Sequence, residues 1–318
     1  MVQTGLQERW SAGMHTGNSD TGRGISEEMK ISFFYDHVLE AAEQSWKTTG
    51  EVMALCRQAG ITGIEINGQY LQENQDRIRR ELEENKMQIS CIYQQYEFGQ
   101  NTDLTAARET VLLAEKFHSQ RVLAIPGFLT EQDAHDLVSR ADTFAHTEQY
   151  MDAHPEIQRM KETLTQMCSF AAEHQVSVVL EDYDNFTAPF ARTWQLLWFM
   201  KNVPGLRYAL DIGNFAYSDE DVLAAYRVLQ PYIVHVHCKD RGRERARENG
   251  RYRKGLAAVP FGYGYLPTAK VLELLKEQQY DGFYAIEHFG APDQLKYMKK
   301  SAEYLQSGKK FRLFPAAF

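Results

Sequence analysis

An eightfold alternation of short apolar runs with longer amphipathic stretches constrains the fold of this chain more than any other feature. The runs are rich in β-branched and aromatic residues, as strands are, and the stretches between them have the apolar spacing of helices. The expected strands are residues 30–35, 61–67, 88–94, 120–126, 176–182, 206–212, 232–239 and 282–288. Eight successive strand-then-helix units favour a closed (β/α)8 TIM barrel over an open doubly wound sheet, which usually has fewer strands.

The helical stretches predict crossover helices on the outside of this barrel. In residues 105–118, for example, Ala107, Val111, Leu112 and Ala114 can form one apolar stripe. Two connections are longer than the others, residues 128–155 after the fourth expected strand and residues 240–265 after the seventh. Both follow the C-terminal ends of strands, and this is the face on which barrels carry their active sites.

The length of 318 residues alone suggests about two domains, but an α/β barrel runs to ~250 residues as one unit. We expect a flexible extension over residues 1–28, a catalytic barrel over 29–307 and a C-terminal tail over 308–318, with Met29 as a candidate natural start. The tail carries three Phe residues. It could pack beneath the barrel, pack on a neighbouring subunit of a homo-oligomer, or be disordered.

Composition argues against several classes of function. The net charge of -8 gives no general attraction for nucleic acid or for an anionic membrane surface. No apolar run approaches the ~18 residues of a membrane helix, and the N-terminus lacks the apolar middle of a signal peptide, so we expect a cytoplasmic protein. The four cysteines are scattered, as expected of reduced thiols, and no glycine-rich phosphate motif supports a nucleotide cofactor.

Four chemically reactive residues stand at the ends of the last four expected strands, namely Glu181, Asp211, His237 and Glu287. A lone carboxylate at a strand end is usually a helix cap or half of an ion pair. Three carboxylates buried together, however, cost many kcal/mol unless a cation neutralises them. One imidazole with three carboxylates suits Mn²⁺ or Mg²⁺ and is tolerable for Co²⁺ or Zn²⁺. These residues therefore predict a divalent metal site.

The seventh strand adds further polar side chains to the same face. Alternation places His235, His237 and Lys239 together, with His235 one layer deeper, where it either hydrogen-bonds to the residues above it or has an ordinary core role. Lys239 can neutralise the excess negative charge or bind a substrate oxygen. We expect Asp240 to orient the following loop and His288 to be a packing residue.

The segments LED, LDIGNF, HVHCKD, VPFGYGYLP and AIEH, in this order, resemble the sugar phosphate isomerase/epimerase members of the xylose isomerase-like TIM-barrel superfamily. The resemblance covers roughly residues 29–307. It implies that Glu181, Asp211, His237 and Glu287 hold one divalent metal. It also implies that the two glutamates shuttle a proton on opposite faces of the substrate.

One position departs from this pattern. Many members, including the DNA-repair endonucleases, carry a His a few residues after the Asp of the sixth strand, where this chain has Asn214. The change removes a ligand or an orienting hydrogen bond, and it weakens a multinuclear zinc site more than a single-metal site.

The expected function is therefore a divalent-metal-dependent isomerase or epimerase of carbohydrate metabolism. It would act on a sugar or sugar phosphate by proton transfer through a metal-stabilised enediolate. The alternatives are a metal-dependent phosphodiesterase of the AP-endonuclease kind and a non-catalytic sugar-binding barrel. We expect a small-molecule sugar as ligand and neither nucleic acid nor membrane as partner.

Candidate substrate-binding residues lie around the expected metal site. They are Lys239, Arg241, Arg245, Glu65, Asn214 and His235; Tyr35, Asn67, Tyr93 and Gln95 stand at other strand ends and either shape the pocket or pack in the barrel. Residues 239–254 hold eight Lys or Arg against three acidic residues, a local balance of +5. This loop is either a grip for an anionic substrate end through Arg241, Arg243 or Arg245, or a solvated lid.

Overall fold

The computed structural model describes residues 29–140, 142–243, 246–248, 251–253 and 255–307. The expectations for residues 1–28, residues 308–318 and Arg245 lie outside the described residues. Within the described residues, no helix is both long enough and apolar enough to span a membrane.

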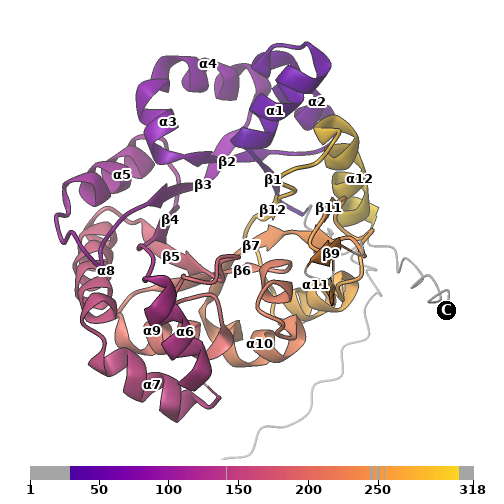
Figure 1. The fold of residues 1–318 in the computed structure, drawn as a ribbon. Coiled ribbons are helices and arrows are strands. Elements are labelled where there is room, and N and C mark those ends of the chain that lie inside the picture. The colour runs from indigo at the N-terminus through magenta and orange to yellow at the C-terminus, as the bar shows by residue number, and fades with distance from the viewer. Residues whose placement is uncertain (1–28, 141, 244–245, 249–250, 254, 308–318) are drawn as a thin grey trace, which may run out of the picture.

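Eight parallel strands close into a barrel in the order β1-β12-β7-β6-β5-β4-β3-β2, as expected from the eight repeated units (Figure 1). The barrel strands are β1 (Ile31–Phe34), β2 (Gly63–Asn67), β3 (Gln88–Gln95), β4 (Arg121–Ile125), β5 (Ser177–Glu181), β6 (Arg207–Asp211), β7 (Ile233–Cys238) and β12 (Tyr284–Ile286). Most of their residues are buried on both faces, because the barrel interior covers one face and the helices cover the other.

The helices form a ring outside the barrel (Figure 1). They are α1 (Tyr35–Ser45), α2 (Thr49–Gln58), α3 (Gly68–Glu73), α4 (Gln75–Asn85), α5 (Thr105–Lys116), α6 (Glu131–Arg140), α7 (Phe144–Ala153), α8 (Pro155–Glu173), α9 (Thr193–Asn202), α10 (Val222–Leu229), α11 (Thr268–Glu277) and α12 (Gln294–Ser307), with short 3-10 turns η1 (Asn214–Ala216) and η2 (Gln230–Tyr232). The long connection after β4 contains α6 and α7.

Two local expectations were wrong. Tyr35 begins α1 rather than ending β1. In α5, Leu112 is 44% exposed, whereas Thr110 and Leu113 join Ala107, Val111 and Ala114 on the buried face. The buried face of α5 therefore includes Leu113 in place of Leu112. Tertiary packing decides which of two neighbouring apolar positions is buried.

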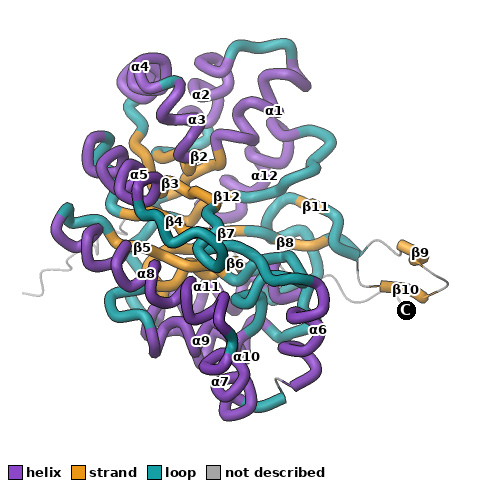
Figure 2. The backbone as a smooth tube through the Cα atoms, turned by 60° about the vertical axis from the view of Figure 1, so that its left-hand side comes forward, coloured by secondary structure: helices purple, strands orange, loops and turns teal. Residues whose placement is uncertain are grey.

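The connection after β7 contains four short strands. β8 (Asp240–Arg241) pairs with β11 (Ala258–Val259) beside the barrel mouth. β9 (Ala246–Glu248) pairs with β10 (Arg251–Arg253), and Figure 2 shows this pair standing away from the barrel. The four cysteines of the chain are free and buried.

Candidate active site

A cavity of about 250 Å³ opens at the C-terminal ends of the barrel strands. Side chains from every barrel strand, or from the residues directly after it, line this cavity, including Phe34, Glu65, Tyr93, Ile125, Glu181, Asn214, His237 and Glu287. The structure thus forms a pocket on the face that the sequence indicated.

The four predicted ligands meet around one ring nitrogen, and three of them, Glu181, His237 and Glu287, line the cavity. Nδ1 of His237 lies 3.0 Å from Oε2 of Glu181, 3.3 Å from Oε2 of Glu287 and 3.8 Å from Oδ2 of Asp211. At most 7% of each of the four residues is exposed. We call this group, Glu181, Asp211, His237 and Glu287, the upper cluster.

Two polar atoms of the upper cluster have no hydrogen-bond partner among the described residues. They are Nδ1 of His237 and Oδ2 of Asp211, and both are buried. Ligand atoms of Glu181, Asp211 and His237 lie within 4.8 Å of one another. Buried polar atoms without partners are costly, whereas a shared cation would satisfy them. The donor set and its spacing therefore fit a divalent metal.

The orientation of Asp211 explains why its Oδ2 has no hydrogen-bond partner among the described residues. Oδ1 accepts the backbone N–H groups of Gly213 at 2.6 Å and Asn214 at 2.9 Å, so it caps the turn that follows β6. The backbone N–H of Asp211 donates to Oδ1 of Asp182 at 2.9 Å, and the Tyr208 hydroxyl donates to the same oxygen at 2.6 Å. Asp182 was missed from sequence, although its place beside Glu181 in the acidic segment LEDYD was a signal.

Burial and mutual repulsion change the proton affinities of the upper cluster. Burial raises the pKa of Glu181 and raises that of Asp211 to about 7. Burial disfavours the charged form of His237, but Glu65, Glu181 and Glu287 together raise its pKa well above the ordinary value. A proton on His237 therefore offsets part of the negative charge when no cation does so.

Lys239 provides a further positive charge beside the upper cluster. Its Nζ lies 2.5 Å from Oε1 of Glu287 and 3.5 Å from Oδ2 of Asp211. Burial alone would lower the pKa of Lys239, but these carboxylates raise it above its usual value. In return Lys239 and His237 hold the pKa of Glu287 below its ordinary value, against the effect of burial.

Asn214 orients the cationic side chains of this site. Its Oδ1 accepts from Nζ of Lys239 at 2.7 Å and from Nη2 of Arg241 at 3.2 Å, while its Nδ2 donates to the Asp182 carbonyl at 2.8 Å. Nothing in the sequence indicated this role, in which the amide orients Lys239 and Arg241.

Arg241 lines the cavity but is 8% exposed, and four of its N–H groups already donate to described residues. The acceptors are the carbonyls of Gly213 (3.2 Å) and Leu256 (2.9 Å), Oδ2 of Asp184 (2.8 Å) and Oδ1 of Asn214. Arg243 is exposed. Arg241 was one of three arginines expected to bind an anionic group, and its N–H groups instead stabilise the loops around the cavity mouth. Arg245 lies outside the described residues.

Asp240 organises the loop that closes the mouth, as expected. Its carboxylate accepts the backbone N–H groups of Gly262 (3.1 Å), Gly264 (2.8 Å) and Leu266 (3.3 Å). A Cβ atom at Gly264 would lie 2.1 Å from Oδ1 of Asp240, so the close approach requires glycine there.

The remaining candidate residues divide into those near the cavity and those turned away. Tyr93 lines the cavity, and its hydroxyl donates a hydrogen bond to Asp36 at 2.5 Å. The other three residues form hydrogen bonds elsewhere: Tyr35 donates to Glu81, Asn67 accepts from the Tyr70 backbone N–H, and Gln95 donates to Glu97. His288 is buried and its ring stacks on His37, as expected of a packing residue, and it also contributes to the cavity lining. Glu65 lines the base of the cavity, and His235 lies fully buried against it.

Comparison with known proteins agrees with the barrel fold. The family described as xylose isomerase-like TIM barrel matches residues 53–308. The chain belongs to this family. Proteins similar to this chain are named for different activities, a dehydratase and an epimerase among them, so the family alone leaves the reaction open.

A curated relative, inosose dehydratase from Clostridium perfringens, is 22% identical over 189 residues, which cover 56% of this chain and 63% of the relative. The match therefore spans less than two thirds of that protein.

Two solved structures share the fold over nearly their whole length. D-allulose 3-epimerase from Methylomonas sp., in complex with D-allulose, has a TM-score of 0.64 and 14% identity, covering 89% of this chain and 98% of that one. A xylose isomerase-like TIM barrel protein from Mycobacterium smegmatis, in complex with magnesium, has a TM-score of 0.62 and 18% identity, covering 89% and 96%.

Proposed function

We propose that this protein is a divalent-metal-dependent isomerase or epimerase of a sugar or sugar phosphate, acting by proton transfer at the carbon beside a carbonyl group. The observation that carries the proposal is the placement of Glu181 and Glu287 around Nδ1 of His237 in one buried pocket, next to Oδ2 of Asp211, which has no hydrogen-bond partner among the described residues. Such a pocket supplies both a base and an acid, and proton transfer next to a carbonyl requires both.

Glu181, Asp211, His237 and Glu287 would hold the metal, and their oxygen-rich set suits Mn²⁺ or Mg²⁺ best. When bound, the metal supplies positive charge beside the carbonyl and adjacent hydroxyl oxygens, which stabilises an enediolate as it forms. The magnesium complex of the Mycobacterium smegmatis relative supports this assignment.

The two glutamates differ in proton affinity, and the difference suits a two-step transfer. Burial raises the pKa of Glu181, which makes it the stronger proton acceptor. Glu287 is held ionised by Lys239, 2.5 Å away. In the reaction one glutamate takes the proton from carbon and the other returns a proton, to the opposite face in epimerisation or to the neighbouring carbon in isomerisation.

A dehydratase is the second candidate, and the match to inosose dehydratase favours it. The first step would be the same removal of a proton beside a carbonyl. The C–H electron pair then forms the C=C bond while the hydroxyl on the next carbon leaves as water, taking a proton from the second glutamate. The two candidates therefore need the same residues and differ in the product.

A panel of ketoses, ketose phosphates and inososes in D₂O, with Mn²⁺-loaded protein, tests the proposal by NMR and mass spectrometry. We expect deuterium at the carbon beside the carbonyl in a product of unchanged heavy-atom composition. Loss of water from the product would establish the dehydratase instead. Binding of a sugar, seen by calorimetry, without any exchange would establish a non-catalytic sugar-binding barrel and overturn the proposal.

A further inference from the structure

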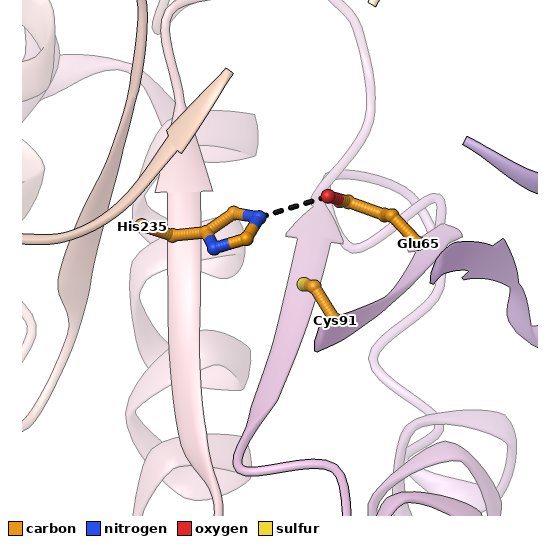
Figure 3. A group of neighbouring side chains, drawn as sticks. All are labelled: Glu65, Cys91 and His235. Carbon is orange, nitrogen blue, oxygen red and sulfur yellow. Dashed lines mark hydrogen bonds and ion pairs between the residues drawn. The ribbon is translucent and has the colours of Figure 1, made fainter. Parts of the chain in front are cut away.

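A second group of buried polar side chains lies directly beneath the upper cluster. Oε2 of Glu65 on β2 is 2.8 Å from Nε2 of His235 on β7, and Oε1 of Glu65 is 3.2 Å from Nε2 of His237. Glu65 and His235 are fully buried, and His237 is 1% exposed. Figure 3 shows Glu65 and His235 pointing toward one another across the barrel interior. We call Glu65 and His235 the lower layer.

Glu65 determines which nitrogen of His237 carries hydrogen. Both oxygens of Glu65 lie within hydrogen-bond distance of imidazole nitrogens, and a carboxylate can only accept hydrogen bonds. Nε2 of His237 must therefore carry the hydrogen that it donates to Glu65. In the neutral ring Nδ1 then keeps its lone pair, and Nδ1 is the atom that faces Glu181, Asp211 and Glu287.

We propose that Glu65 is a positioning residue that holds His237 in the Nε2–H tautomer and presents Nδ1 to the divalent cation. This inference rests on the metal site of the proposed function. Carboxylate partners of metal-bound histidines fix both ring orientation and tautomer in this way. His235 has a supporting role, because it takes the second oxygen of Glu65 and so fixes the plane of the carboxylate.

The strand register of the barrel shifts beside both residues of the lower layer, Glu65 on β2 and His235 on β7. The register between β2 and β3 shifts between Ile64 and Glu65, which leaves Ser90 as an extra residue on β3. The register between β6 and β7 shifts immediately before His235, which leaves Val234 as an extra residue on β7. Bulges are rare between parallel strands and re-aim side chains beside active sites. Their positions here agree with a requirement to aim Glu65 and His235 at one another.

Cys91 raises a competing interpretation, a second metal site formed by Glu65, Cys91 and His235. Ligand atoms of these three residues lie within 4.8 Å of one another, and Figure 3 shows the Cys91 thiol below the Glu65–His235 bond. Both oxygens of Glu65, however, already receive hydrogen bonds. Oδ2 of Asp211 and Nδ1 of His237 in the upper cluster receive none among the described residues. We therefore assign the cation to the upper cluster and a hydrogen-bonding role to the lower layer.

The experiment combines a variant series with a direct measurement of the tautomer. Glu65→Gln removes the charge at nearly constant shape, and its amide oxygen can serve only one imidazole. Cys91→Ala is the matched control, because it changes the same layer without touching a hydrogen-bond partner of His237. Calorimetry with Mn²⁺ gives affinity and stoichiometry, and ¹⁵N NMR of the Mg²⁺-loaded wild-type protein gives the tautomer of His237, assigned by comparison with His237→Gln.

We expect one equivalent of Mn²⁺ in the wild type, a loss of affinity of about 10–100-fold in Glu65→Gln and wild-type affinity in Cys91→Ala. The NMR spectrum should show a metal-bound Nδ1 and a hydrogen on Nε2, as the hydrogen bond from His237 to Glu65 requires.

Hydrogen on Nδ1, or equal affinities in the two variants, would overturn the role of Glu65. A second equivalent lost in Cys91→Ala would make the lower layer a metal site and overturn it as well. The proposed function fails separately, if the wild type binds no divalent metal. The tautomer measurement does not use Glu65→Gln, so hydrogen on Nδ1 would overturn the proposal even if that variant does not fold.

Discussion

The upper cluster contains His237 and the lower layer contacts it, but the two differ in their balance of carboxylates and imidazoles. In the upper cluster three carboxylates surround one ring nitrogen, and two buried atoms lack hydrogen-bond partners among the described residues. In the lower layer one carboxylate lies between two imidazoles, and both its oxygens are paired. The upper cluster has excess negative charge and buried atoms without hydrogen-bond partners among the described residues, so a cation would stabilise it. The carboxylate of the lower layer is already hydrogen-bonded, so it can orient His237.

The largest expected effect is on catalysis by the upper cluster. Glu181→Gln and Glu287→Gln should each reduce deuterium exchange into the substrate by at least ~10²-fold, because each removes one partner of the proton transfer. Exchange is followed by NMR with the substrate that the D₂O panel identifies. Glu84→Gln, on the exposed face of α4, is the control and should keep wild-type exchange. Wild-type exchange in either active-site variant would place the proton carrier elsewhere.

The pH dependence of metal binding is the next largest effect. The pKa of His237 is raised well above its ordinary value in the metal-free protein, so a metal must displace the proton on Nδ1. Affinity for Mn²⁺ should therefore rise with pH, about tenfold per pH unit for one displaced proton, and level off above the His237 pKa. Calorimetry in buffers of different ionisation enthalpy measures the released proton. A flat profile from pH 6 to 8 would contradict the assignment.

Stability of the metal-free protein should respond with opposite signs in the two layers. The pKa of Asp211 is raised to about 7, so at pH 8 its ionised form costs the folded state free energy, and Asp211→Asn should stabilise by about 1 kcal/mol or more. Glu65→Gln leaves one imidazole without its acceptor and should destabilise by about 1–3 kcal/mol. Chemical denaturation at pH 8 with EDTA measures both. Changes of the same sign would remove the distinction between the layers.

The smallest expected effect concerns Arg241 at the rim of the upper cluster. Four of its N–H groups already donate to described residues, so Arg241→Ala should raise KM only a few-fold, and equally for a ketose and its phosphate. Steady-state kinetics on both sugars measure this. A much larger rise for the phosphate would show that Arg241 binds an anionic group directly and would favour a phosphorylated substrate.

The fold and the upper cluster were predictable because both depend on short-range sequence patterns, namely the strand-helix alternation and the polar residues at strand ends. Eight strand-helix units predict a barrel, and a parallel barrel brings the C-terminal ends of all strands to one face. Glu181, Asp211, His237 and Glu287 each stand at such an end, so their convergence follows once the closed order is accepted. Exposure of Leu112 was not predictable, because two adjacent leucines in α5 compete for one buried position.

The lower layer was harder to predict because its contacts join distant strands. Glu65 and His237 are 172 positions apart, and their contact depends on barrel closure and on register shifts that no local pattern predicts. The signal was a glutamate between the two isoleucines of β2, on a chain whose β7 carries two inward histidines. The role of Asn214 was equally hidden, since it depends on Lys239 and Arg241 from a later connection.

Anomalous diffraction from crystals grown with Mn²⁺ tests the division into two layers most directly. We expect one anomalous peak, ~2.0–2.6 Å from Nδ1 of His237 and from oxygens of Glu181, Asp211 and Glu287. We expect no peak among Glu65, Cys91 and His235. A peak in the lower layer, coordination through Nε2 of His237, or no peak at saturating Mn²⁺ would contradict the assignment of the cation to the upper cluster.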